Sequence, residues 1–321
     1  MSDASAGTSA GAIVPPSRRR SRKVARAIFI YVFVPYFGLT AILGSFQRRL
    51  IYLPRAVSDL TPEQAGLPRG KVHAISTTTE DGLRLNGWHI LPDGKTADDH
   101  GDCDRELEDG GYVVLYFYGN AGSRVRQVQD VRDFTSLGCH VFLFDYRGYG
   151  DNPGSPSETG LAADARAVWK YAVDERKLPH DRILLFGQSL GGAVATRLAE
   201  EASRQKTAPA GLIVNATFSS LTDAAQWHYP FLPVRLVLVD RYPSTDRIGK
   251  VTCPILVMHG DKDDIVPIAQ GRKLFESAPA QSENGIPKRF VEFSNVGHND
   301  VSHVLLSGAV KSFLAEIEKV K

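Results

Sequence analysis

Apolar and polar positions divide the 321-residue chain into two unequal parts. Residues 27–47 (AIFIYVFVPYFGLTAILGSFQ) contain no charged side chain, whereas from residue 52 onward short apolar runs alternate with amphipathic segments. At about 1.5 Å per residue, roughly 20 helical residues span the ~30 Å hydrocarbon core of a bilayer. The pattern therefore predicts a transmembrane helix over residues 27–47 and a folded domain over residues 48–321.

Basic residues flank the apolar stretch unequally. Six precede it and three follow it within ten residues: Arg18, Arg19, Arg20, Arg22, Lys23 and Arg26, then Arg48, Arg49 and Arg55. Because Lys and Arg near a span favour the cytoplasmic side, this difference predicts a domain on the non-cytoplasmic side. We expect residues 1–26 to form a disordered basic tail. One alternative is a cleaved signal peptide, although its leader and apolar core are usually shorter. Another is a buried helix of a soluble protein, which would need a polar stripe.

The folded part predicts a parallel sheet covered by helices. Apolar runs typical of buried strands are each followed by a turn and an amphipathic segment, which is the order of βα units. These runs are residues 113–117, 141–144, 183–186, 212–214, 255–258 and 290–293. Before them, residues 72–77 and 83–90 flank Glu80-Asp81-Gly82, which predicts a hairpin.

Two segments interrupt this alternation. Residues 218–242 are rich in proline, aromatic and leucine side chains, which predicts a small apolar cap within about residues 218–250. Residues 98–111 are polar and acidic, and their Asp, His and Cys positions fit no metal-ligand spacing. We therefore expect residues 98–111 to form a solvated surface loop.

Composition excludes little. A net charge of +2 gives no electrostatic reason to expect a nucleic-acid partner. The three cysteines are an odd number without zinc-type spacing, and Cys139 and Cys253 beside apolar runs are expected to be core thiols.

Candidate chemistry gathers at the carboxyl ends of the predicted strands, where open α/β sheets place their sites. Gly187-Gln188-Ser189-Leu190-Gly191 joins a strand to a helix, and a serine at such a sharp corner is exposed between its glycines. His298 follows the last strand, and Asp263 follows the strand before it. Acyl transfer needs a nucleophile, a base and a carboxylate that orients the base. We predict Ser189, His298 and Asp263 for these roles.

Nearby residues offer alternatives. Asp261 and Asp264 could replace Asp263, but Asp263 stands just before a helix that Pro267 can open. Other candidates for the base are His228, His259 and His303, for which pocket-lining, packing and helical positions are expected.

The oxyanion donors are expected to be the backbone amides of Leu190 and Asn120. Leu190 follows the nucleophile, and Asn120 lies in Tyr118-Gly119-Asn120-Ala121-Gly122 after the first parallel strand. Taken alone, that loop could equally be a plain βα turn.

These motifs together resemble α/β-hydrolase fold serine hydrolases, in the membrane-anchored branch of the α/β-hydrolase domain-containing proteins. The resemblance runs from about residue 46 to the end, through Phe46-Gln47, Leu50-Ile51-Tyr52-Leu53-Pro54, Gly119-Asn120-Ala121-Gly122, Asp145-Tyr146-Arg147-Gly148-Tyr149-Gly150, Gly187-Gln188-Ser189-Leu190-Gly191-Gly192, His259-Gly260…Asp263…Val266-Pro267 and Gly297-His298-Asn299-Asp300. It implies a mostly parallel eight-stranded sheet with helices on both faces. It also implies Ser189, Asp263 and His298 as the triad of an esterase, thioesterase or lipase without cofactor or metal. The family has histidine where this chain has Tyr118.

The sequence therefore predicts a single-span, membrane-anchored serine hydrolase acting on a small-molecule or lipid ester or thioester. An apolar cap beside a bilayer favours acyl-lipid or lipidated substrates. One alternative is a serine peptidase, which would need a charged group to hold a peptide end, and none is identifiable. The other is a catalytically silent, membrane-bound interaction protein, for which Tyr118 is the suggestive feature.

Overall fold

The structure, a computed structural model, describes residues 18–108 and 110–320 and divides after Phe46 into two units. In the first unit, α1 (Arg18–Ile28) continues through a π-helical turn (Phe29–Phe33) into α2 (Val34–Ile51), which ends in the second unit. Residues 25–51 are long and apolar enough to cross a membrane, and an 18-residue stretch within them has a mean hydropathy of 2.0. A signal sequence near the N-terminus would meet the same criteria of length and composition.

The predicted disordered tail lies outside the described residues as far as Ser17. Residues 18–26 lie in α1, so the prediction of disorder is wrong for them. Arginine, lysine and alanine are strong helix formers. Extending a helix that already exists adds one hydrogen bond for each residue fixed, without a new nucleation cost.

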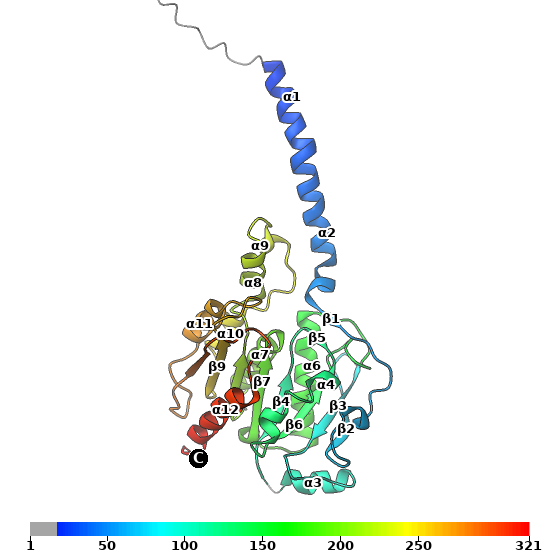
Figure 1. The fold of residues 1–321 in the computed structure, drawn as a ribbon, viewed down its shortest axis with the longest axis vertical. Coiled ribbons are helices and arrows are strands. Elements are labelled where there is room, and N and C mark those ends of the chain that lie inside the picture. Colours follow the sequence, from blue (N-terminus) through cyan, green and yellow to red (C-terminus); the bar gives the residue numbers. More distant parts are fainter. Residues whose placement is uncertain (1–17, 109, 321) are drawn as a thin grey trace, which may run out of the picture. The chain divides into compact units, whose positions relative to one another are not determined.

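The second unit is built on an eight-stranded sheet in the order β10-β9-β8-β7-β4-β6-β3-β2 (Figure 1). The two strands of the predicted hairpin, β2 and β3, pair antiparallel, and β3 is antiparallel to β6 as well. All other neighbours are parallel, so the predicted fold class is confirmed. The strands are β2 (Val72–Thr78), β3 (Arg84–Ile90), β4 (Val113–Phe117), β6 (His140–Phe144), β7 (Ile183–Gln188), β8 (Gly211–Asn215), β9 (Ile255–Gly260) and β10 (Arg289–Phe293).

Continuous apolar runs form these strands because helices cover the sheet. Every residue of β4, β6 and β8 is buried, which leaves no polar alternation along them. The α-helices that follow β4 in the chain, including α8 and α9 of the predicted cap, are α4 (Arg124–Gln127), α5 (Arg132–Thr135), α6 (Glu158–Lys170), α7 (Leu190–Arg204), α8 (Leu221–His228), α9 (Val234–Val237), α10 (Ser244–Ile248), α11 (Ile268–Ser277) and α12 (His303–Glu318). Cys139 and Cys253 are buried in this core, as predicted.

The prediction of a surface loop over residues 98–111 is wrong, because α3 (His100–Glu108) lies within it. The Asp99 carboxylate accepts a hydrogen bond at 2.9 Å from the backbone N–H three residues later, as a helix-capping side chain does. Cys103 and Leu107, one turn apart, are both buried. Two apolar residues four positions apart are enough to dock a short polar helix, and the acidic composition conceals this spacing.

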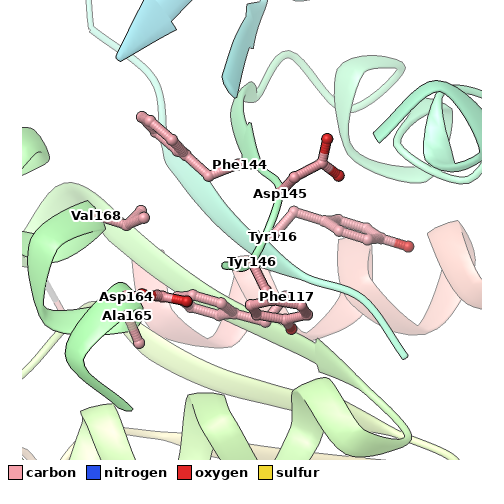
Figure 2. Close-up of a pocket in the computed structure, with 8 residues that line it drawn as sticks. All are labelled: Tyr116, Phe117, Phe144, Asp145, Tyr146, Asp164, Ala165 and Val168. Atoms are coloured by element: carbon pink, nitrogen blue, oxygen red, sulfur yellow. The ribbon is translucent and has the colours of Figure 1, made fainter. Parts of the chain in front are cut away.

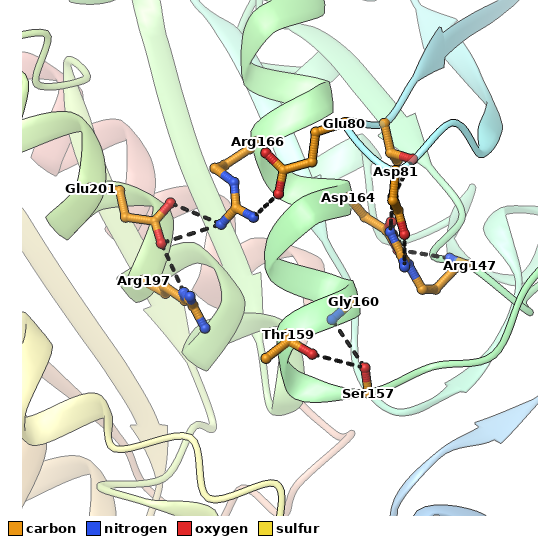
Figure 3. A network of polar contacts seen from close by, with 11 residues as sticks. Glu80, Asp81, Arg147, Ser157, Thr159, Gly160, Asp164, Arg166, Arg197 and Glu201 are labelled. Atoms are coloured by element: carbon orange, nitrogen blue, oxygen red, sulfur yellow. Dashed lines mark hydrogen bonds and ion pairs between the residues drawn. The ribbon is translucent and has the colours of Figure 1, made fainter.

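Ion pairs bind α6 to the β2–β3 turn and to α7 (Figure 3). Arg166 on α6 contacts Glu80 in the turn and Glu201 on α7, the latter at 3.4 Å. Arg147 contacts Asp164 of α6 at 2.8 Å, with both side chains almost fully buried. The helix that follows Ser189 is thereby held against a neighbour that is itself fixed at several points.

Candidate active site

Ser189 occupies the corner between β7 and α7 with φ +51° and ψ −119°. A positive φ is costly for a residue with a Cβ and persists only where the surroundings impose it. A Cβ on Gly187 would lie 2.3 Å from the carbonyl oxygen of Gly191, and one on Gly191 would lie 2.0 Å from that of Phe117. The two glycines are therefore required for the strand, the helix and the neighbouring loop to pass this closely.

Two neighbours from the end of β8 hold the corner. The Ser189 N–H donates to the carbonyl oxygen of Asn215 at 2.9 Å. The Thr217 hydroxyl donates to the carbonyl oxygen of Ser189 at 2.7 Å. Neither Asn215 nor Thr217 stands out in the sequence, because both act through contacts made only in the folded sheet.

The structure brings Ser189, His298 and Asp263 together. His298 Nε2 lies 3.1 Å from the Ser189 hydroxyl oxygen, and His298 Nδ1 lies 2.7 Å from Asp263 Oδ2. His298 is only 8% exposed, and the Asp263 side chain is completely buried. Both nitrogens of one imidazole therefore have an oxygen partner, which is the geometry needed to move a proton from a hydroxyl.

The Asp263 carboxylate is fixed by the chain around it. Oδ1 accepts hydrogen bonds from the N–H groups of Ile265 and Val266 at 3.0 and 2.7 Å. Burial raises the pKa of Asp263, but hydrogen bonds from His259, His298 and the Val266 N–H lower it more. The resulting pKa lies well below that of an ordinary aspartate, so the group is ionised at neutral pH and can stabilise an imidazolium.

The other two aspartates of the loop lie elsewhere. Asp261 accepts the backbone N–H of Asn295 at 2.6 Å, and Asp264 is exposed to solvent. Within the described part of the chain, no hydrogen bond joins Asp261 or Asp264 to His298. The geometry therefore favours Asp263 as the partner of the imidazole.

The remaining candidate histidines have structural partners. His259 is buried, as expected for packing, and its Nε2 lies 2.7 Å from the carbonyl oxygen of Val266 and 3.2 Å from Asp263 Oδ2. The sequence did not indicate this second contact. His228, the last residue of α8 in the predicted cap segment, contacts the carbonyl oxygen of Ile265, and His303, the first residue of α12, pairs with the Asp133 carboxylate.

The loop after β4 runs beside the nucleophile. A Cβ on Gly119 would lie 3.6 Å from the Cβ of Ser189, an ordinary van der Waals contact, so the backbone of this loop passes directly beside the nucleophile. Asn120 is bound to the segment that follows α2: its side chain donates to the carbonyl oxygen of Ile51, and its carbonyl accepts from the Leu53 N–H, both at 2.9 Å. Leu190 begins α7 on the other side of Ser189.

Tyr118, at the start of this loop, anchors it to the core. It is fully buried, and its hydroxyl donates to Asp145 Oδ1 at 2.7 Å. Asp145 also accepts hydrogen bonds from the backbone N–H and the guanidinium of Arg124, each at 2.6 Å. The Tyr118 side chain therefore belongs to a buried ionic cluster that supports the loop. Asp145 belongs to a motif visible in the sequence, but nothing there singles out Arg124.

One small cavity lies away from this site, between the central sheet and α6 (Figure 2). Its lining residues are Tyr116, Phe117, Phe144, Asp145, Tyr146, Asp164, Ala165 and Val168. It offers space for about one water molecule, and its lining includes none of Ser189, His298 and Asp263. Among residues 18–108 and 110–320, no group of three or more His, Cys, Asp or Glu side chains could hold a metal ion.

Comparison with known proteins gives this geometry a family. A family model described as α/β hydrolase fold matches residues 112–228. The lysophosphatidylserine lipase ABHD12 of Danio rerio is 30% identical over 298 residues, which cover 84% of this chain and 77% of that protein. The chain belongs to the α/β-hydrolase family. An uncharacterized protein of Mycobacterium tuberculosis is also similar to this α/β hydrolase, with 39% identity over 87% of the chain and 91% of the relative.

A solved structure agrees with the fold of this α/β hydrolase. The α/β hydrolase of Vibrio vulnificus superposes with a TM-score of 0.59 at 21% identity, over 82% of this chain and 96% of that one. Fold and relatives together make the protein a serine ester hydrolase.

Proposed function

We propose that this α/β hydrolase is a membrane-anchored serine hydrolase that cleaves acyl esters or thioesters, with Ser189 as nucleophile. The observation that carries the proposal is the chain of contacts from Ser189 Oγ through His298 to Asp263, at 3.1 and 2.7 Å. A chain of this kind can activate a hydroxyl that would otherwise be a weak nucleophile at neutral pH.

In the first half-reaction, Ser189 Oγ attacks the acyl carbonyl carbon while its proton passes to His298 Nε2. The ionised Asp263 holds the imidazole through Nδ1 and stabilises its charged form. The backbone N–H groups of Leu190 and Asn120 are the proposed donors to the oxyanion of the tetrahedral intermediate. When the intermediate collapses, the bond to the leaving alcohol or thiol breaks, and His298 returns the proton to that group.

In the second half-reaction, water attacks the acyl-enzyme and gives its proton to His298. Collapse of the second tetrahedral intermediate releases the carboxylic acid and restores the Ser189 hydroxyl. Each step moves one proton through the same imidazole, so the cycle needs no further reactant beyond water.

The proposed substrate is an acyl lipid, in the first instance a lysophospholipid. Vertebrate relatives that are 27–30% identical are named lysophosphatidylserine lipases, which supports a lipid ester. The apolar helix over residues 25–51 supports attachment to the membrane in which such lipids reside. Residues 27–47 are the proposed span, and residues 48–321 the hydrolase domain with its cap.

Ser189→Ala tests the proposal in the full-length protein. We expect loss of labelling by a fluorophosphonate probe and of nearly all ester hydrolysis, because the nucleophilic oxygen is removed. Ser277→Ala is the matched control, since Ser277 is exposed on α11 and only bonds the carbonyl oxygen of Lys273. Undiminished turnover by Ser189→Ala, with an unchanged circular-dichroism spectrum, would falsify the proposed chemistry.

A further inference from the structure

Large apolar side chains are exposed on the cap, around α8 and α9. These two helices pack on each other and lie together at one end of the hydrolase domain (Figure 1). The cap tip, as we define it, consists of Trp227, Tyr229, Phe231, Leu236 and Val239, which are 55, 52, 66, 84 and 64% exposed. Soluble surfaces rarely gather apolar side chains of this size, and a patch of them marks an interaction site.

The cap tip is carried on a well-held base. On α9 and just after it, Val234 and Leu238 are buried, whereas Leu236 between them points outward. The Glu158 carboxylate at the start of α6 accepts the N–H groups of Arg241 and Tyr242 at 2.7 and 3.0 Å. The apolar side chains of the tip are therefore exposed on one side of a segment whose other side is packed against the domain.

The cap is also bound to the residues at which the uncharged stretch ends. The Gln47 side chain donates to the carbonyl oxygen of Val237 at 3.0 Å and accepts the N–H of Val239 at 2.7 Å. Arg48 forms an ion pair with the buried Asp240 carboxylate at 3.0 Å. The segment that carries Leu236 and Val239 thus lies within one hydrogen bond of residue 47.

These bonds place the cap segment beside the residues at which the proposed span ends. Residue 47 is the last uncharged position of the proposed span and Arg48 the first charged one, so they mark the boundary between hydrocarbon and head groups. Because the cap segment is hydrogen-bonded to Gln47, Leu236 and Val239 lie close to the residue at which that boundary is expected. The side chains nearest the membrane surface are therefore among the most exposed apolar ones.

The side chains of the cap tip are of the kinds that favour the boundary between hydrocarbon and head groups. Tryptophan and tyrosine rings, such as Trp227 and Tyr229, favour the interface because one end of each ring is polar. Arg235 and Arg241 on the same segment are exposed, and Arg235 remains mostly accessible although it pairs with Asp223. Guanidinium groups beside an apolar tip are placed to meet lipid phosphates.

We propose that the cap tip is a membrane-docking surface, which enters the boundary between head groups and acyl chains of the bilayer that holds the span. The inference rests on the proposed membrane anchoring. Docking gives the domain a second attachment, so it is held against the leaflet in which an acyl lipid would be found.

Trp227 provides a direct probe of this contact. The chain has three tryptophans, of which Trp88 is fully buried and Trp169 is 9% exposed. The full-length protein is placed in vesicles of dioleoyl phosphatidylcholine, and in matched vesicles whose acyl chains carry bromine, a short-range quencher. We expect bromine to lower the emission, and Trp227→Phe to remove most of that quenching. Equal emission of the wild-type protein in the two lipids overturns the proposal.

A charged tip tests the consequence for turnover. In the double variant Leu236→Glu and Val239→Glu, we expect bromine quenching to be lost, because carboxylates resist entry into the interface. Hydrolysis of an acyl lipid embedded in the vesicles should fall about tenfold, while hydrolysis of a water-soluble short-chain ester stays within about twofold. Val320→Glu is the control, since Val320 is 51% exposed just after α12, a helix that Figure 1 places away from α9. Equal loss on both substrates contradicts docking.

Other occupants and other failures give different results. If the tip joined two copies of this chain, the double variant would change the oligomeric state and the wild-type protein would show no bromine quenching. Failure of the proposed span would appear as release of the wild-type protein from vesicles by alkaline carbonate. Failure of the proposed chemistry would appear as fluorophosphonate labelling that does not depend on Ser189.

Discussion

At the scale of single residues, the Asp263 carboxylate is the most completely coordinated group of the site. Oδ1 accepts two backbone N–H groups, and Oδ2 lies 2.7 Å from His298 Nδ1 and 3.2 Å from His259 Nε2. Four donors around one buried carboxylate fix both its position and its charge. A change of one atom in this group should therefore affect the imidazole without creating a cavity.

Asp263→Asn should lower kcat by about 10⁴, because the amide cannot hold the imidazole in the required tautomer. Asp261→Asn and Asp264→Asn should remain within about tenfold of wild type, since neither group bonds the imidazole. Steady-state kinetics on one soluble ester compares the three variants. If kcat fell most in Asp261→Asn or Asp264→Asn, that aspartate and not Asp263 would be the carboxylate that orients His298.

A buried histidine pair gives the domain a dependence on pH. His140 Nδ1 lies 3.0 Å from His89 Nε2, and both side chains are buried. Burial lowers the pKa of His140 from 6.5 to about 4. Between these values the unfolded chain takes up a proton that the folded protein does not, so this residue makes stability fall as pH falls.

Between pH 7 and pH 5, the free energy of unfolding should therefore drop by about 2 kcal/mol more in wild type than in His140→Asn. Denaturant titration of both detergent-solubilised proteins at the two pH values measures the difference. Asparagine keeps a polar group near the position of Nδ1 but does not titrate. Identical pH dependence of the two proteins would mean that His140 is already protonated in the folded state at pH 5.

At the scale of elements, the end of α2 and the residues directly after it support the site. β1 (Leu53–Pro54) pairs in parallel with β5 (Ala121–Gly122), directly after Asn120. Further up the chain, Gln47 and Arg48 bond the cap. One short segment thus contacts both the loop beside Ser189 and the cap, so its position influences the site.

Two substitutions at Asn120 distinguish the structural role of its side chain from the proposed role of its backbone N–H as an oxyanion donor. Asn120→Ala removes only the side-chain bond to Ile51, and kcat should stay within about tenfold of wild type. Asn120→Pro removes that bond and the backbone N–H as well, and kcat should fall by about 10²–10³. Circular dichroism and thermal unfolding check that both variants keep the fold. Equal, mild effects would assign the oxyanion donor to another group.

At the scale of the whole molecule, the expected membrane orientation depends on the charges beside the proposed span. Six basic residues precede residues 27–47 and three follow within ten positions, which favours a cytoplasmic N-terminus. A long domain after the span crosses the membrane largely regardless of its own charge. The three cysteines are buried singly, so their unpaired state is compatible with either compartment.

A pair of C-terminal reporters measures this orientation, one active only outside the cytoplasm and one only inside. We expect signal from the outside reporter alone. Replacing three of the leading arginines (Arg18, Arg19 and Arg20) with Gln should increase the inside signal, because the charge difference across the span disappears. A signal from the inside reporter alone in wild type would reverse the topology and leave the chemistry unchanged.

The sequence by itself determined the strands of the main sheet, their order along the chain and the apolar helix near its start. Continuous apolar runs predict buried parallel strands, because both faces of such a sheet are covered. Once strand order is that of an open α/β sheet, Ser189, Asp263 and His298 each follow a strand at the same edge, so their proximity could be expected. Uncharged residues 27–47 predict the apolar helix for an equally local reason.

Only the tertiary structure decided what depends on contacts between distant residues. The buried cluster of Tyr118, Asp145 and Arg124, and the bonds from Gln47 to the cap, join positions that no periodicity relates. The helix at His100–Glu108 belongs to the same class, because its two buried side chains matter only where a core meets them. A local pattern specifies which face of an element is apolar, whereas the partner of that face depends on the packing of the whole domain.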